Sequence, residues 1–129
     1  MPDRPLSPHL TVYKIRYTLV SSIVNRGTGL ALTAGFLVLV YWVMSILGGP
    51  QAYQRSEEVF AHPLSKVVLS GFIFAFCYHF IAGIRHLIWD TGRGMERRQS
   101  QISAWVVGAL SVLLTLVLVY WAFCPAVPR

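Results

Sequence analysis

Two histidines and an aspartate share one face of a helix that the sequence predicts within a long apolar run. Residues 79–90 read HFIAGIRHLIWD, and the residues just before them are uncharged. At about 100° per residue, His79, His86 and Asp90 fall on nearly one line, with the two histidines roughly 10 Å apart along the axis. Gly83 lies one turn from His79 on nearly the same side. Ionisable side chains in a membrane-length apolar helix cost free energy, so this face indicates a functional site.

A histidine beside a glycine in such a helix can be an axial ligand of haem iron, through a neutral imidazole nitrogen. Glycine suits this role because it removes a side chain where a flat group can lie. If His79 holds the iron, His86 lies where a haem propionate would reach, and Arg26 from an earlier helix can help to neutralise the propionates. The alternative is that His79 is hydrogen-bonded to a neighbouring helix. His86 is two turns away and cannot bind the same iron, so a six-coordinate haem needs a second histidine from another polypeptide.

The other charged and thiol side chains allow fewer conclusions. Asp90 is either a proton donor near a quinone site or a helix-end acid paired with Arg85 or Arg93, and Arg85 itself points away from the histidine face. Cys77 and Cys124 lack the spacing of a zinc, iron–sulfur or covalent haem site. Nothing in the sequence indicates a flavin- or nucleotide-binding motif. We therefore predict that the chain is one part of a larger electron-transfer assembly.

A second polar cluster lies where the first apolar run begins, at residues 21–29, SSIVNRGTG. On a helix, Ser22 and Arg26 share a face, and Asn25 lies beside them. This combination makes a pocket of hydrogen-bond donors in which Arg26 can hold a carboxylate or a quinone carbonyl. The alternative is that Arg26 extends to the phosphates of lipid headgroups.

Three membrane-spanning helices must position these side chains. The chain has 129 residues, of which 55% are hydrophobic and 12% charged, and the apolar residues occur in blocks. A block of about 20 apolar residues crosses a bilayer as a helix. We predict an N-terminal arm at 1–20, spans at about 21–47, 64–90 and 101–124, and a loop at 48–66 between the first two spans. Little sequence remains for a soluble domain, so residues 1–129 are expected to form a single all-α transmembrane anchor domain.

The net charge of +6 comes from basic residues that flank the predicted spans. This placement argues against nucleic-acid binding and for membrane topology, because positive residues favour the cytoplasmic side. We therefore expect a cytoplasmic N-terminus and a periplasmic C-terminus. Residues 1–16 contain neither the apolar core of a signal peptide nor a transit segment. The expected location is a multi-pass position in a bacterial inner (cytoplasmic) membrane rather than in the mitochondrial inner membrane.

Two motifs resemble those of a known family. Residues 79–92, HFIAGIRHLIWDTG, are similar to the second-helix signature of the cytochrome b subunit of succinate dehydrogenase. Residues 4–10, RPLSPHL, and residues 22–29, SIVNRGTG, agree with the N-terminal part of that family. The motifs occur in order and at suitable separation in a chain of the right length, so the resemblance covers essentially the whole chain.

The resemblance implies a membrane anchor of respiratory complex II, succinate:ubiquinone oxidoreductase. This anchor is not expected to be catalytic by itself, whereas the complex is an enzyme. In that family two membrane subunits hold haem b between them, one axial histidine from each, and His79 would be the ligand from this chain. The iron–sulfur and flavoprotein subunits would dock on this anchor pair and pass electrons to ubiquinone. Ser22 and Arg26 fall on the family's quinone-binding positions. The resemblance also places His86, Arg26 and Asn25 near the propionates and Asp90 on the acid that ends the second helix.

Asn25 departs from the family pattern, which usually has histidine at this position. Asparagine can donate a hydrogen bond but cannot carry a charge, so a contact with a propionate would be weaker and a protonation role would be lost. Two related alternatives stay open: the anchor of a fumarate reductase that runs the reverse reaction, and a structural anchor that holds no haem. A proton-relaying transporter subunit is disfavoured by three spans without an internal repeat.

Overall fold

The computed structural model describes residues 17–124, which form four helices and no strand. Their bounds are α1 (Tyr17–Leu47), α2 (Pro50–Ala61), α3 (Pro63–Asp90) and α4 (Arg97–Phe123). The predicted N-terminal arm at 1–20 lies outside the described residues except for its last four positions, which belong to α1. The motif at 4–10 also lies outside them.

Three of these helices are long and apolar enough to cross a membrane, which confirms the predicted all-α membrane fold. α1, α3 and α4 contain 31, 28 and 27 residues. At about 1.5 Å per residue each exceeds the roughly 30 Å thickness of the hydrocarbon core. The orientation of the termini across the membrane stays a prediction.

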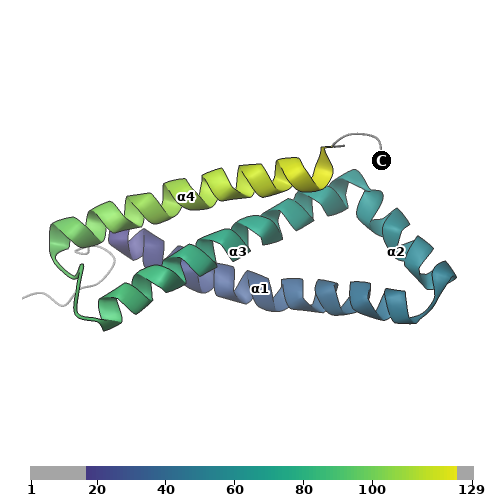
Figure 1. Ribbon diagram of the computed structural model, residues 1–129, viewed down its shortest axis with the longest axis horizontal. Coiled ribbons are helices and arrows are strands. Elements are labelled where there is room, and N and C mark those ends of the chain that lie inside the picture. The colour runs from purple at the N-terminus through teal and green to yellow at the C-terminus, as the bar shows by residue number, and fades with distance from the viewer. Residues whose placement is uncertain (1–16, 125–129) are drawn as a thin grey trace, which may run out of the picture.

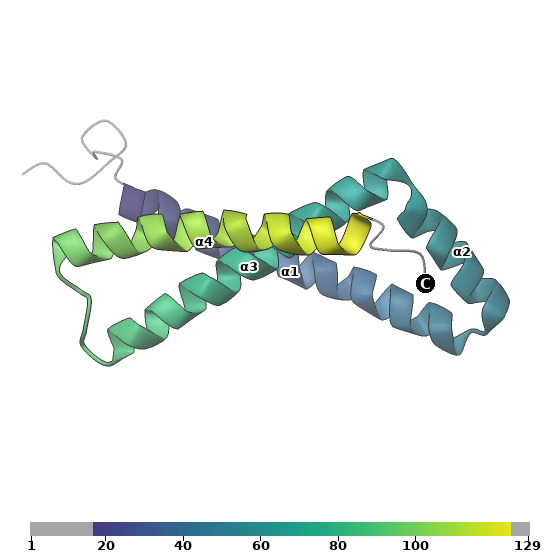
Figure 2. The ribbon, with the colours of Figure 1, turned by 45° about the horizontal axis from the view of Figure 1, so that its top comes forward.

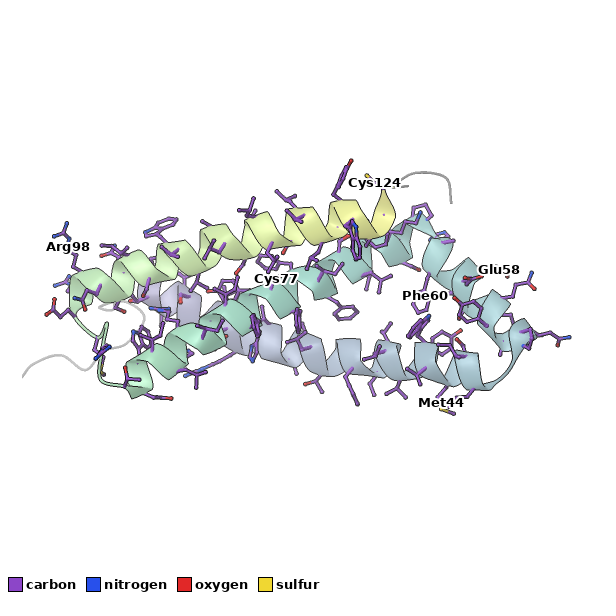
Figure 3. The ribbon with its side chains drawn as sticks, viewed as in Figure 1. Met44, Glu58, Phe60, Cys77, Arg98 and Cys124 are labelled. Carbon is purple, nitrogen blue, oxygen red and sulfur yellow. The ribbon has the colours of Figure 1, made fainter. Side chains whose placement is uncertain are left out.

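The middle helix of the three, α3, packs on both of its neighbours. Figure 1 shows α3 between α1 and α4, and Figure 2 shows the three helices converging near their middles. The buried centre consists of Tyr78 and Ala82 from α3 and Val107 from α4. Ala104 on α4 is fully buried, and small residues of this kind let helix backbones approach closely. Most larger apolar side chains project outward along the helices (Figure 3), as a chain surrounded by lipid and other membrane helices requires.

The segment between the first two spans, predicted as a loop, contains the helix α2. Gly49 has a φ of +87°, and Pro50 begins the helix, a position that suits proline because its missing N–H has no partner there. A hydrogen bond of 2.9 Å from Ser45 Oγ to Ser56 Oγ fastens α2 to the end of α1. The result is that α2 closes the end of the molecule opposite the turn between α3 and α4 (Figures 1 and 2).

The turn between α3 and α4 lies at the other end of the molecule, next to the polar end of α3. Gly92 and Gly94 have φ values of +76° and +75°, which glycine adopts without strain. The indole Nε1 of Trp89 donates to the Gly94 oxygen at 3.1 Å. This bond holds the turn against α3, so the start of α4 lies beside the end of α3.

Candidate functional site

The imidazole of His79 is held against α1 through its Nδ1 atom. Nδ1 lies 3.1 Å from the backbone oxygen of Asn25 and 3.3 Å from Oγ1 of Thr28. The Thr28 hydroxyl already donates its proton to the same Asn25 oxygen, at 2.9 Å. A carbonyl oxygen can only accept, so Nδ1 must carry the proton and donate it. The other ring nitrogen, Nε2, therefore keeps its lone pair, which is the tautomer that binds a metal.

Glycines on both helices shape the space around this ring. A Cβ atom at Gly29 on α1 would lie 3.1 Å from Cε1 of His79, so glycine lets the ring approach the helix closely. At Gly83, one turn after His79 on α3, a Cβ atom would meet nothing within 4 Å. The ring is thus packed on its α1 side, while the Gly83 side is open within residues 17–124. A flat group has room on that open side.

Asn25 places a second polar group beside the ring. Its backbone oxygen accepts from His79 and Thr28, whereas its side-chain Oδ1 is buried and has no hydrogen-bond partner among the described residues. A buried polar atom left without a partner costs about 1–3 kcal/mol. We therefore expect a donor from outside residues 17–124 to reach it. Ser22 and Arg26, on the same helix, are exposed and available to other molecules.

His86 and Asp90 are exposed on α3, toward the turn. The ring of His86 meets that of Trp89 edge-on, with centroids 5.1 Å apart. Asp90 is the last residue of α3. The guanidinium of Arg85 bonds to serine residues and not to Asp90. Of the two pairings considered for Asp90, the one with Arg85 is therefore not formed. The predicted roles near a propionate and as a proton donor stay predictions.

The sequence did not indicate the surroundings of Arg85, which the structure buries between three helices. Its side chain is only 7% exposed. Nε donates to Ser103 Oγ at 3.0 Å, one terminal nitrogen donates to Ser21 Oγ at 2.9 Å, and the other donates to the Ser100 oxygen at 3.0 Å. One signal was available in the sequence: Ser100 and Ser103 share a helix face, and an arginine pointing away from the histidine face needs such partners.

The described residues can supply one metal ligand but not a complete metal-ion site. Within residues 17–124 there is no group of three or more histidine, cysteine, aspartate or glutamate side chains that could hold an ion. A single neutral imidazole nitrogen beside open space instead fits a metal that already has a planar ligand set, as haem iron does. The remaining axial position would then need a ligand from another chain.

Comparison with known proteins identifies relatives of the whole chain. The family described as "Succinate dehydrogenase/Fumarate reductase transmembrane subunit" matches residues 1–118. The succinate dehydrogenase cytochrome b556 subunit of Paracoccus denitrificans is 37% identical over 123 residues, covering 94% of this chain and 95% of the relative. The corresponding subunit of Rickettsia typhi is 40% identical over 116 residues, covering 89% and 90%. The mitochondrial cytochrome b560 subunit of Mus musculus is 34% identical over 113 residues, covering 86% and 67%.

Proposed function

Since the chain belongs to the succinate dehydrogenase/fumarate reductase transmembrane subunit family, as a succinate dehydrogenase cytochrome b membrane subunit, we propose that it holds haem b through His79. We also propose that it helps to form a ubiquinone-reduction site through Ser22 and Arg26. The haem would be shared with a second membrane subunit that supplies the other axial histidine. The iron–sulfur and flavoprotein subunits would dock on the cytoplasmic side of this pair.

The state of the His79 imidazole is the observation that carries this proposal. Its Nδ1 proton is directed to the Asn25 carbonyl, which leaves Nε2 free to bind iron and fixes the orientation of the ring. Such second hydrogen bonds raise the basicity of a ligand and hold its geometry. A histidine that served only to join two helices would not need the open side next to Gly83.

The polar residues around this ring suit the rest of a haem group. When bound, haem supplies one-electron transfer at the iron. His86 and Arg26 are exposed and can offer positive or hydrogen-bonding groups to its two propionates. The side chain of Asn25 lies in the same region, and its amide nitrogen can donate a hydrogen bond to a propionate without adding a charge, while its unpartnered Oδ1 would need a separate donor. The donor set therefore fits the group.

The quinone site is proposed on the exposed face of α1. Ser22 and Arg26 lie four residues apart and are both exposed, so their side chains can reach one small ligand. A guanidinium binds a carbonyl oxygen that gains negative charge on reduction, because the bond strengthens with that charge. Asp90 is the proposed proton donor from the end of α3. Partner subunits would supply the rest of an apolar pocket.

The chain is a multi-pass membrane protein, and we place it in a bacterial inner membrane with its N-terminus in the cytoplasm. Its relatives include both bacterial and mitochondrial subunits. The chain would be non-catalytic alone, because succinate oxidation would occur on the flavoprotein. A fumarate reductase anchor is the second candidate, since the matched family description covers both enzymes.

A reduced-minus-oxidised visible spectrum of the purified complex tests the haem assignment. His79→Ala should remove the b-type signal while all subunits remain in the complex. His86→Ala is the matched control, because it removes a histidine from the same face of α3 without removing the proposed ligand, and it should retain the signal. Full haem content in the His79→Ala complex would overturn the ligand assignment, and a wild-type complex without a b-type signal would leave a quinone-binding anchor that holds no haem.

The same preparations test the quinone site. Arg26→Ala should lower the rate of ubiquinone reduction by about tenfold or more, since the loss of a charge-assisted hydrogen bond costs about 1.5–3 kcal/mol. Succinate oxidation with a soluble dye bypasses the membrane subunits and should be unchanged. Equal losses in the two assays would instead place Arg26 in assembly of the complex.

A further inference from the structure

Arg85 is a charged side chain buried at the polar end of the bundle, without an acidic partner among residues 17–124. It is 7% exposed, and its bonds are to serine side chains and one backbone oxygen. With a second contact to Ser100 Oγ at 3.3 Å, four of its five N–H groups are used. The guanidinium also lies over the Trp89 ring, 4.0 Å from the centroid. Its donors are therefore nearly all satisfied inside the chain, which leaves little capacity for an external ligand.

The bonds of Arg85 connect all three long helices. Ser21 belongs to α1, Arg85 to α3, and Ser100 and Ser103 to α4. Burying a charge is costly in a membrane helix, so an uncharged residue would join these helices at a lower cost. The guanidinium fork of arginine, in contrast, reaches serines on α1 and α4 at the same time.

Ser21 is one of the residues through which α3 contacts α1. Its side chain accepts from Arg85 at 2.9 Å, and its backbone oxygen accepts from the Tyr78 hydroxyl at 3.2 Å. Ser21 is 5% exposed, so both bonds are shielded from solvent. Two α3 side chains therefore fix both the rotation and the axial position of α1 at this residue.

The proposed haem and quinone side chains lie within the next turn of α1. Ser22 follows Ser21 directly, and Asn25 lies one turn further, about 6 Å along the axis. The Asn25 oxygen is 3.1 Å from Nδ1 of His79. A displacement of α1 by about 0.5 Å along the line between these two atoms would lengthen this contact to about the limit of a hydrogen bond. The position of α1 at Ser21 therefore bears on how well the His79 tautomer is held.

We propose that Arg85 is a positioning residue which sets the register of α1 against α3, so that the Asn25 carbonyl meets the His79 imidazole and the Ser22–Arg26 face keeps its place beside it. This inference rests on the proposed function, because it assumes that His79 and the Ser22–Arg26 face bind haem and quinone. Arg85 acts through Ser21 and touches neither ligand.

Two single hydrogen bonds separate positioning from a purely structural role. Ser21→Ala removes the bond from Arg85 to α1, and Ser103→Ala removes a bond of nearly equal length from Arg85 to α4. Arg85 keeps its bonds to Ser100 of α4 in the second variant, so the comparison is made on the haem and quinone signals and not on stability. If Arg85 only joins helices, neither variant should change those signals. If it positions α1, only Ser21→Ala should change the haem and quinone sites.

The test measures two signals in the assembled complex of each variant. The first is the low-spin electron paramagnetic resonance signal of the oxidised haem, which reports the orientation of its axial ligands. The second is the KM for ubiquinone, compared with the KM for succinate in a soluble-dye assay. Ser21→Ala should shift the resonance signal and raise the quinone KM by about tenfold, the low end of the effect of one hydrogen bond to a charged group. Ser103→Ala should match the wild type in both.

Arginine-to-lysine variants provide an independent comparison. Arg85→Lys keeps the charge but loses the fork that reaches α1 and α4 together, so it should act as Ser21→Ala does. Arg98→Lys is its matched control, because Arg98 is exposed and projects outward at the start of α4 (Figure 3). If Arg85→Lys prevents assembly, the serine pair still decides the question.

The outcomes separate this inference from the proposed function. A normal wild-type haem signal with equal results for Ser21→Ala and Ser103→Ala would overturn the positioning role alone. A wild-type complex that gives no b-type signal would overturn the haem assignment and, with it, the register proposal. A shift confined to Ser21→Ala and Arg85→Lys, with succinate oxidation by the dye unchanged, would establish the positioning role.

Discussion

Replacing Gly29 with alanine tests how closely the His79 imidazole must approach α1. The new Cβ atom would lie 3.1 Å from Cε1 of His79 and 3.6 Å from Nδ1. Ordinary van der Waals contact begins at about 3.4 Å, so the ring or the helix must move by a few tenths of an ångström. The movement would act directly on the contact between Nδ1 and the Asn25 oxygen, which is already 3.1 Å long.

Two opposing effects determine the size of the change. Alanine is favoured over glycine inside a helix by about 1 kcal/mol. Overpacking a close contact costs about 1–3 kcal/mol. At Gly27, where a Cβ atom would meet nothing within 4 Å, only the first effect applies. The difference between the two alanine variants therefore isolates the contact with His79, and 1–3 kcal/mol corresponds to about 5- to 150-fold in an equilibrium constant.

The assay measures haem per assembled complex and its rate of loss on warming, from the b-type absorption. Gly29→Ala should hold haem about 5- to 150-fold more weakly than Gly27→Ala, or keep it with a shifted low-spin resonance signal if the ring moves and still binds. Gly27→Ala should hold haem at least as well as the wild type. Identical haem content, spectrum and thermal loss in the two variants would refute the close packing of His79 on α1 as a requirement of the site.

Three further substitutions probe the open side of the His79 ring, the Asn25 position beside that ring and the opposite end of the molecule. Gly83→Ala should lower haem content while leaving subunit assembly intact, because its Cβ meets nothing within 4 Å among the described residues and would occupy the space proposed for the haem; normal haem binding would place the group elsewhere. Asn25→His should be tolerated and should keep haem content, as checked by the b-type spectrum, whereas collapse of the complex would contradict the packing of α1. Ser56→Ala should lower the free energy of unfolding by about 1 kcal/mol, the value of one hydrogen bond. It should leave the haem spectrum unchanged, because Ser56 fastens α2 to α1 far from His79. An altered spectrum would show coupling between the two ends of the molecule.

Several features of the fold follow from local sequence alone. A helix repeats every 3.6 residues whatever surrounds it, so the common face of His79, Gly83 and His86 could be predicted once the segment was assigned to a helix. The three membrane-length helices follow from the length and hydrophobicity of each apolar run. The helix α2 was missed because its segment is short and polar on average, and such a helix depends on tertiary contacts, here the bond between Ser45 and Ser56.

The contacts between helices could not be predicted in the same way. Sequence spacing placed Arg85 away from the histidines but could not say that serines of α1 and α4 would surround it. It placed Asn25 beside Arg26 but could not show that its backbone oxygen would receive the His79 proton. Which atoms meet between two helices depends on their crossing angle and axial offset, and these are set by packing over the whole interface.

The sequence by itself determined the membrane class of the protein, the number of its spans and the face of α3 on which ionisable groups gather, because hydrophobicity and helical period are local properties. The tertiary structure decided which nitrogen of His79 carries the proton, which glycine lies against its ring and what surrounds the charge of Arg85. These depend on distances of a few ångströms between residues that lie 15 to 64 positions apart in the sequence, and the packing of α1 and α4 against α3 sets those distances.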